Sequence, residues 1–229
     1  MPSIEEKKEP GLQAQKSLDK SSEGHKKEDS RQKLFVLLIA AVVVAFVGIV
    51  VVLKLLPAKQ PIEMVRYNQF DFIKSAGSWF TQWQYGKELY TIPFRFNPYE
   101  VENVSITGSL DEAFNEANVT FITFDPDTEN LTYVALGAAE LSISLAQVLG
   151  VNLEAACTKN VTGPCTNRTI ITCEEANKRG RAATAVIYIR ESEKPEVVFN
   201  GRCVIVQGRQ LELVKAVDRL LYKWYGIMS

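Results

Sequence analysis

Acidic side chains alternate along the segment FDPDTEN, in which single residues separate Asp125, Asp127 and Glu129. Carboxylates are preferred ligands of Ca²⁺, which is abundant outside cells. The segment lacks the central glycine and the distal glutamate of an EF-hand loop, and Pro126 favours an ordinary turn. The residues therefore predict either a Ca²⁺ site formed by these three carboxylates or a plain turn at the end of a strand.

A second candidate for ligand chemistry is the pair Gly208-Arg209, which stands where a strand is expected to give way to a helix. Free N–H groups at a helix N-terminus, together with an arginine side chain, can hold an anion. The alternative is an ordinary helix start without a ligand. Gly208 and Arg209 are therefore candidate anion-binding residues.

The scarcity of histidine limits the kinds of catalysis that the chain can perform. The chain has one histidine, His25, and it lies near the N-terminus. The absence of histidine from the rest of the chain excludes Ser-His-Asp and Cys-His catalysis and histidine zinc sites there. Hydrolysis by paired carboxylates remains open, because it needs only two acids about 5–10 Å apart. Candidate acids are Asp71, Glu100, Asp125 and Glu140. Their spacing does not predict a pair, so we expect no catalytic residues.

An apolar run without charges extends from Leu34 to Leu53. As a helix it would be about 30 Å long, which matches the hydrocarbon core of a bilayer. A cleaved signal peptide would have a shorter apolar run near the N-terminus and a cleavage site of small residues after it. The run therefore predicts an uncleaved signal-anchor that crosses the lipid bilayer once.

The apolar run also sets the expected domain organisation. We expect a disordered cytoplasmic tail over 1–33, a transmembrane helix over 34–56, a juxtamembrane linker over 57–64 and an extracytoplasmic α+β domain over 65–229. The tail mixes eight basic with seven acidic residues, which predicts disorder and argues against a nucleic-acid-binding arm. The basic residues that flank the run slightly favour a cytoplasmic N-terminus.

Glycosylation sequons support that orientation, because all five lie after the apolar run. The acceptor residues are Asn103, Asn118, Asn130, Asn160 and Asn167. Chance would give only about one or two sequons in a region of this composition. The alternative is that asparagine and threonine are simply common in the turns of a β-rich domain. The sequons predict a glycoprotein whose large domain faces a glycosylating compartment.

The four cysteines also follow the apolar run. They are Cys157, Cys165, Cys173 and Cys203, separated by 8, 8 and 30 positions. An even number of cysteines outside a membrane predicts disulfides, and these spacings do not fit zinc-binding or C-x-x-C redox pairs. Of the three possible connectivities, we expect Cys157 with Cys165 and Cys173 with Cys203. A cytoplasmic domain with free thiols is the alternative, and it would reverse the topology.

Side-chain periodicity predicts an antiparallel β-sheet covered by two amphipathic helices. Strands are expected at 69–73, 78–85, 88–96, 101–107, 119–124, 185–190 and 197–206, with helices at about 132–149 and 209–225. The first strands carry nine aromatic residues between Phe70 and Phe96. These could line a groove for a glycan or another ligand, although at least half must face the core because neighbours on a strand face opposite sides.

Three segments, YTIPFRFNPYEV, ITFDPD and AVDRLLYKWYG, resemble those of uncharacterised archaeal single-pass membrane proteins with an extracellular α+β domain. The resemblance implies an archaeal origin and brings no known activity with it. The leading hypothesis is a membrane-anchored extracytoplasmic domain with a non-enzymatic binding or structural role in the cell envelope or a membrane complex. Its expected partner is a protein or a glycan at the outer surface. The alternative is a carboxylate-dependent hydrolase of an envelope polymer.

Overall fold

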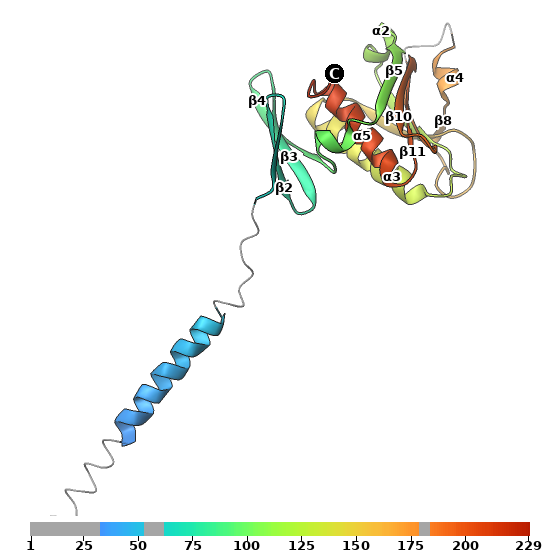
Figure 1. Ribbon diagram of the computed structural model, residues 1–229. Helices are drawn as coiled ribbons and strands as arrows, with labels where there is room; N and C mark the ends of the chain where they lie inside the picture. The colour runs from blue at the N-terminus through green and yellow to red at the C-terminus, as the bar shows by residue number, and fades with distance from the viewer. Residues whose placement is uncertain (1–32, 53–61, 179–183) are drawn as a thin grey trace, which may run out of the picture. The chain divides into compact units, whose positions relative to one another are not determined.

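The computed structural model describes residues 33–52, 62–178 and 184–229 (Figure 1). They form two compact units that divide between Pro61 and Ile62. In the first unit, Lys33–Val52 is a continuous helix of 20 residues that is long and apolar enough to cross a membrane. The predicted tail up to residue 32, and residues 53–61 of the predicted helix end and linker, lie outside the described residues.

The second unit begins with a four-stranded antiparallel meander. Its strands are β1 (Met64–Tyr67), β2 (Phe70–Ser75), β3 (Ser78–Tyr85) and β4 (Glu88–Phe94), which pair in sequence order. Ala76 and Gly77 both have positive φ, as a two-residue turn between antiparallel strands requires. The aromatic alternation predicts β2, β3 and β4, whereas the short β1 was not predicted.

A seven-stranded mixed sheet forms the rest of the unit. Its strands are β5 (Ser105–Leu110), β6 (Thr120–Phe124), β7 (Leu153–Cys157), β8 (Thr169–Ile170), β9 (Ala185–Glu191), β10 (Glu196–Gly201) and β11 (Cys203–Gly208). The spatial order is β5-β10-β11-β9-β6-β7-β8. Only β10 and β11 pair antiparallel; the other neighbours are parallel. The mixed α+β class is as predicted.

Six helical segments accompany these strands within residues 62–178 and 184–229. They are η1 (Pro98–Val101), α2 (Glu112–Asn115), α3 (Leu131–Ile143), the π-helical turn η2 (Ser144–Val148), α4 (Cys173–Ala176) and α5 (Leu211–Trp224). The long helices α3 and α5 contact each other, and they reach the larger sheet at β9 and β11 (Figure 1). This sheet is mostly parallel, not antiparallel as predicted, because α3 is a crossover that returns the chain to a parallel strand.

Two features explain that difference. The strand β7 lies in the cysteine-containing segment, where no strand was predicted, and it completes the parallel unit β6-α3-β7. The run predicted as one strand over 197–206 is a hairpin, since Gly201 turns the chain with a φ of 59°. The segment Leu131–Val148 is also long and apolar enough to cross a membrane, but it packs against α5 and β9 within the unit.

The meander joins the larger sheet through α5. Tyr222 is fully buried, and its ring stacks on Phe94 with 4.2 Å between ring centroids. The edge of Phe72 meets the same tyrosine at 5.7 Å. Farther along, Trp83 Nε1 donates a hydrogen bond of 2.9 Å to the carbonyl of Tyr225. The inward aromatic side chains of the meander are therefore the core between this small sheet and α5.

A buried carboxylate fixes the segment where the meander ends. Asp218 of α5 accepts hydrogen bonds from the backbone N–H groups of Arg95 (2.9 Å) and Phe96 (2.8 Å). Tyr222 donates its hydroxyl to the Phe96 carbonyl at 2.6 Å. The Arg95 side chain pairs with Glu140 of α3 at 2.7 Å. Burial raises the pKa of Asp218 well above its ordinary value, and nearby Glu140 raises it further.

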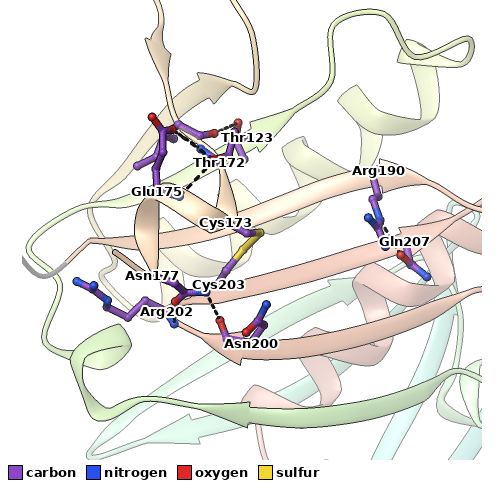
Figure 2. The surroundings of a disulfide bond; sticks show 11 residues. Thr123, Thr172, Cys173, Glu175, Asn177, Arg190, Asn200, Arg202, Cys203 and Gln207 are labelled. Carbon is purple, nitrogen blue, oxygen red and sulfur yellow. Dashed lines mark hydrogen bonds between the residues drawn. A yellow bond between two sulfur atoms is a disulfide. The ribbon is translucent and has the colours of Figure 1, made fainter. Parts of the chain in front are cut away.

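Two disulfides hold the segment between β7 and β11. Cys157 bonds to Cys165 and Cys173 to Cys203, the expected connectivity, with Cα atoms 5.9 and 5.3 Å apart. Figure 2 shows the second disulfide beside Asn177, whose side chain accepts from Arg202 N (2.8 Å) and donates to Asn200 O (3.0 Å). The disulfide and these two hydrogen bonds tie α4 to the β10-β11 hairpin.

The two disulfides are expected to differ in their contribution to stability. Replacing Cys173 and Cys203 by alanine opens a loop of 30 residues, which should lower the unfolding free energy by about 3.6 kcal/mol. Replacing Cys157 and Cys165 opens a loop of 8 residues, with an expected loss of about 2.5 kcal/mol. Chemical denaturation of both double variants measures the difference. A smaller loss for the longer loop would contradict this expectation.

The stability of the domain should depend on pH through Asp218. Its folded pKa is raised, so its contribution is complete below about pH 4, the pKa of an unfolded carboxyl, and is lost as pH rises through the folded value. Asp218→Asn keeps an oxygen for the two N–H groups but cannot titrate. Its unfolding free energy should therefore fall less than that of the wild type between about pH 4 and pH 7. Equal slopes in denaturation series would contradict this assignment.

Candidate functional site

Both candidate ligand sites predicted from the sequence lie at one edge of the larger sheet. Asp125, Asp127 and Glu129 follow β6, and Gly208 with Arg209 ends β11. Because β6, β9 and β11 are parallel, their carboxyl ends share an edge. The chain also reverses strand order beside β6, and in open α/β sheets such a position is a common ligand site. Free binding groups would therefore be expected at this carboxyl edge.

A lysine bridges the two aspartates at the carboxyl edge. Lys159 Nζ lies 3.0 Å from Asp125 Oδ1 and 2.7 Å from Asp127 Oδ2. Its hydrogen bonds with Asp127 and then Asp125 raise the pKa of Lys159, so the ammonium remains charged. Glu129 is exposed. No group of three or more acidic, histidine or cysteine side chains within the described ranges is placed to hold a metal ion, and the Ca²⁺ site stays a prediction.

The other side chains of this edge also pair with one another. Glu191 accepts from Thr128 Oγ1 at 2.7 Å and from Asn130 Nδ2 at 2.6 Å, which fixes the turn before α3. Arg209 pairs with Glu193 at 3.0 Å. A Cβ at Gly208 would meet Leu213 N at 2.6 Å, because the start of α5 folds closely over it. The anion site at Gly208 and Arg209 also stays a prediction. The side chains around it at the carboxyl edge form contacts with one another.

The carboxylates proposed for hydrolysis have separate partners. Asp71 lies 3.7 Å from Arg66, and Asp125 pairs with Lys159. Glu100 accepts from the N–H of Asn97 at 2.7 Å in the capping box of η1. Glu140 pairs with Arg95. Each of the four acids therefore contributes to a local contact of the fold.

The aromatic residues of the meander divide between its two faces. Phe72, Trp79 and Phe94 are buried, and Tyr85 is 63 % exposed. The remaining members, Phe70, Phe80, Trp83, Tyr90 and Phe96, are partly buried. On the outer face, strand register places Met64, Ile73 and Phe80 in one cross-strand row. The aromatic group is thus mainly core, and two of its members, Phe70 and Phe80, line an open hollow of about 740 Å³ on the meander.

A cavity of about 450 Å³ lies at the opposite, amino edge of the larger sheet. It is lined by Phe114, Asn115, Ala117, Asn118, Thr120, Leu145, Leu149, Gly150, Val151, Asn152, Ile187 and Trp224. These residues come from α2 and the loop after it, from β6 and β9, from η2 and the turn before β7, and from the end of α5. Its volume falls in the range of small-ligand sites, which is about 300–1,000 Å³.

Hydrogen bonds fix the rim of the cavity. Thr120 N donates to Asn152 O at 2.9 Å, and Asn152 Nδ2 donates to Asn118 O at 3.3 Å. In the segment that leads to Asn152, α3 widens into the π-helical turn η2, after which Val151 N donates to Leu145 O at 3.0 Å. Such π-helical turns are frequent at functional sites. The rim therefore joins the start of β6 to the start of β7 in a fixed geometry.

The lining combines aromatic rings with amides and carries no charge among the described residues. Trp224 and Phe114 are partly buried, with ring centroids 6.4 Å apart. The side-chain amides of Asn115 and Asn118 are exposed, and neither forms a hydrogen bond with the described residues. Such a site can stack an apolar ring face and exchange hydrogen bonds with neutral groups.

Most of this lining could not be identified from the sequence. The apolar periodicity of α5 predicts that Trp224 belongs to the core. Phe114 lies in a four-residue helix that was not predicted. Asn118 alone was singled out, as a glycosylation sequon. No family model, curated protein or solved structure matches the chain. The fold and the cavity therefore define the protein only as a mixed α+β domain, with an uncharged ligand-sized cavity, that follows an apolar helix.

The five sequons differ in the availability of their acceptor nitrogen. Asn103, Asn118, Asn160 and Asn167 are exposed. Asn130 is partly buried, and its Nδ2 is the atom that donates to Glu191. A glycan on Asn130 would crowd the contact that fixes the turn before α3.

We therefore expect the folded protein to carry glycans at exposed sequons and none at Asn130. Mass spectrometry of glycopeptides from protein purified from its native membrane measures occupancy at each position. Occupancy of Asn130 equal to that of Asn103 would contradict the structural role assigned to its amide. Asn103 is the matched comparison, because its own side chain is exposed in the turn before β5.

Proposed function

We propose that this protein is a membrane-tethered, non-enzymatic binding domain whose cavity takes a neutral saccharide. The observation that carries the proposal is the lining of the amino-edge cavity, where Trp224 and Phe114 stand beside three asparagines without any charged group. The apolar face of a sugar ring stacks on an aromatic ring, and its hydroxyl and acetamido groups exchange hydrogen bonds with amides. An anionic ligand would find no compensating cation there.

Two further features support the proposed location of the domain. The helix Lys33–Val52 is long and apolar enough to serve as a single membrane anchor. The two disulfides are typical of a compartment outside the cytoplasm. Together they support an anchor with a cytoplasmic N-terminus and a domain at the outer surface. There, glycans of the envelope or of neighbouring glycoproteins are available partners.

Binding measurements on the detergent-solubilised, unglycosylated chain test the proposal. Isothermal titration with N,N′-diacetylchitobiose or mannobiose should give a measurable affinity, and the matching sugar phosphate should bind more weakly. Trp224→Ala should weaken the best neutral saccharide by about tenfold or more, since truncating a central aromatic residue usually removes a large share of the binding energy. Circular dichroism checks that the variant is folded.

Tyr85→Ala is the matched control, because Tyr85 is an aromatic residue of the meander that is 63 % exposed and does not line the cavity. This variant should keep the affinity of the wild type. Neutral saccharides that bind neither protein, or that bind Trp224→Ala as tightly as the wild type, would contradict the proposed function.

A further inference from the structure

One sequon lies on the wall of the cavity. Asn118 is exposed and lines the cavity, and its side-chain amide is free of hydrogen bonds to the described residues. The backbone on either side is fixed, because the Asn118 carbonyl accepts from Asn152 and Thr120 N donates to Asn152 O. A sugar joined to Asn118 Nδ2 would therefore start at the mouth of the cavity.

The chemistry of the first sugar matches the cavity that it would meet. A neutral pyranose has an apolar ring face for Trp224 or Phe114 and polar substituents for the amides of Asn115 and Asn152. The sugar can make these contacts without breaking an ion pair, because the lining residues are uncharged. The other exposed sequons, Asn103, Asn160 and Asn167, do not line this cavity.

Attachment also removes most of the entropic cost of binding. A ligand on a short flexible tether has a local concentration in the millimolar range. At a local concentration of a few millimolar, an attached sugar that binds with a Kd of about 1 mM occupies the cavity in roughly four molecules out of five. A free saccharide of the same intrinsic affinity would need an equal concentration in solution to compete.

We propose that the glycan on Asn118 folds back into the amino-edge cavity and closes it, so that only chains without this glycan are open to saccharides from outside. The inference rests on the proposed function, because it assigns a particular saccharide to the same site. Occupancy of the Asn118 sequon then regulates the site. It requires no movement of the protein backbone.

Hydroxyl-radical footprinting with mass spectrometry tests this on full-length protein purified from its native membrane. The rate of Trp224 oxidation is compared between the wild type and Asn118→Gln, which keeps an amide but cannot be glycosylated. We expect Trp224 to react about fivefold more slowly in the wild type, the protection that corresponds to four occupied cavities in five. Trp79, which is 2 % exposed, serves as the internal reference.

Asn103→Gln is the matched control, since it removes a glycan that does not reach the cavity. It should leave Trp224 as protected as in the wild type. Three results would overturn the inference: an unmodified Asn118 in the native protein, equal Trp224 rates in wild type and Asn118→Gln, or the same rise in Asn103→Gln.

Titration of the unglycosylated wild-type chain with N,N′-diacetylchitobiose and mannobiose separates this inference from the proposed function. Binding to the unglycosylated chain without any protection of Trp224 in the glycosylated protein would overturn the inference and leave the function standing. Protection in the glycosylated protein without binding of either sugar to the unglycosylated chain would support the attached glycan as occupant and overturn the role as a receptor for outside saccharides.

Discussion

Asp218 lies in the middle of α5, 1 % exposed, and its carboxylate receives the N–H groups of Arg95 and Phe96. Those two residues end the meander, and the chain turns there into η1 and the larger sheet. A buried acceptor is costly unless donors satisfy it, so this contact specifies one position of the loop against the helix. The stacking of Tyr222 on Phe94 and the hydrogen bond from Tyr222 to Phe96 act on the same segment. The placement of α5, and with it of Trp224, depends on this junction.

The topology gives the larger sheet one edge with charged side chains and one edge with an uncharged cavity. Turns after β6, β9 and β11 meet at the carboxyl edge, and their acids and bases pair within a few ångströms of one another. At the amino edge, the ends of η2 and α5 approach the starts of β6 and β7 and leave an uncharged cavity. In open parallel sheets the carboxyl edge is the usual ligand site. Here its polar groups are used by the fold, and the cavity lies at the other edge.

Local sequence patterns predicted the elements better than their assembly. Aromatic alternation predicted β3 with its observed bounds, and the stripe from Leu213 to Trp224 predicted α5. The even number of cysteines predicted two disulfides, and the expected pairing is the one observed. Strand pairing is not local, so β7 was hidden in a polar, cysteine-rich segment, and the hairpin at Gly201 read as one strand. The cavity was beyond sequence reasoning for the same reason, since Phe114, Asn152 and Trp224 are distant in the chain and adjacent only after the sheet has formed.

If the uncharged cavity, and not the charged carboxyl edge, is the ligand site, a neutral saccharide should change the resonances of the cavity lining. Backbone and indole resonances of the isotopically labelled, unglycosylated chain, followed during titration with a neutral saccharide, test this most directly. Shifts should concentrate at Asn118, Asn152 and the Trp224 indole. Shifts concentrated at Lys159, Glu191 and Arg209 instead, or no shifts for any neutral saccharide, would contradict it.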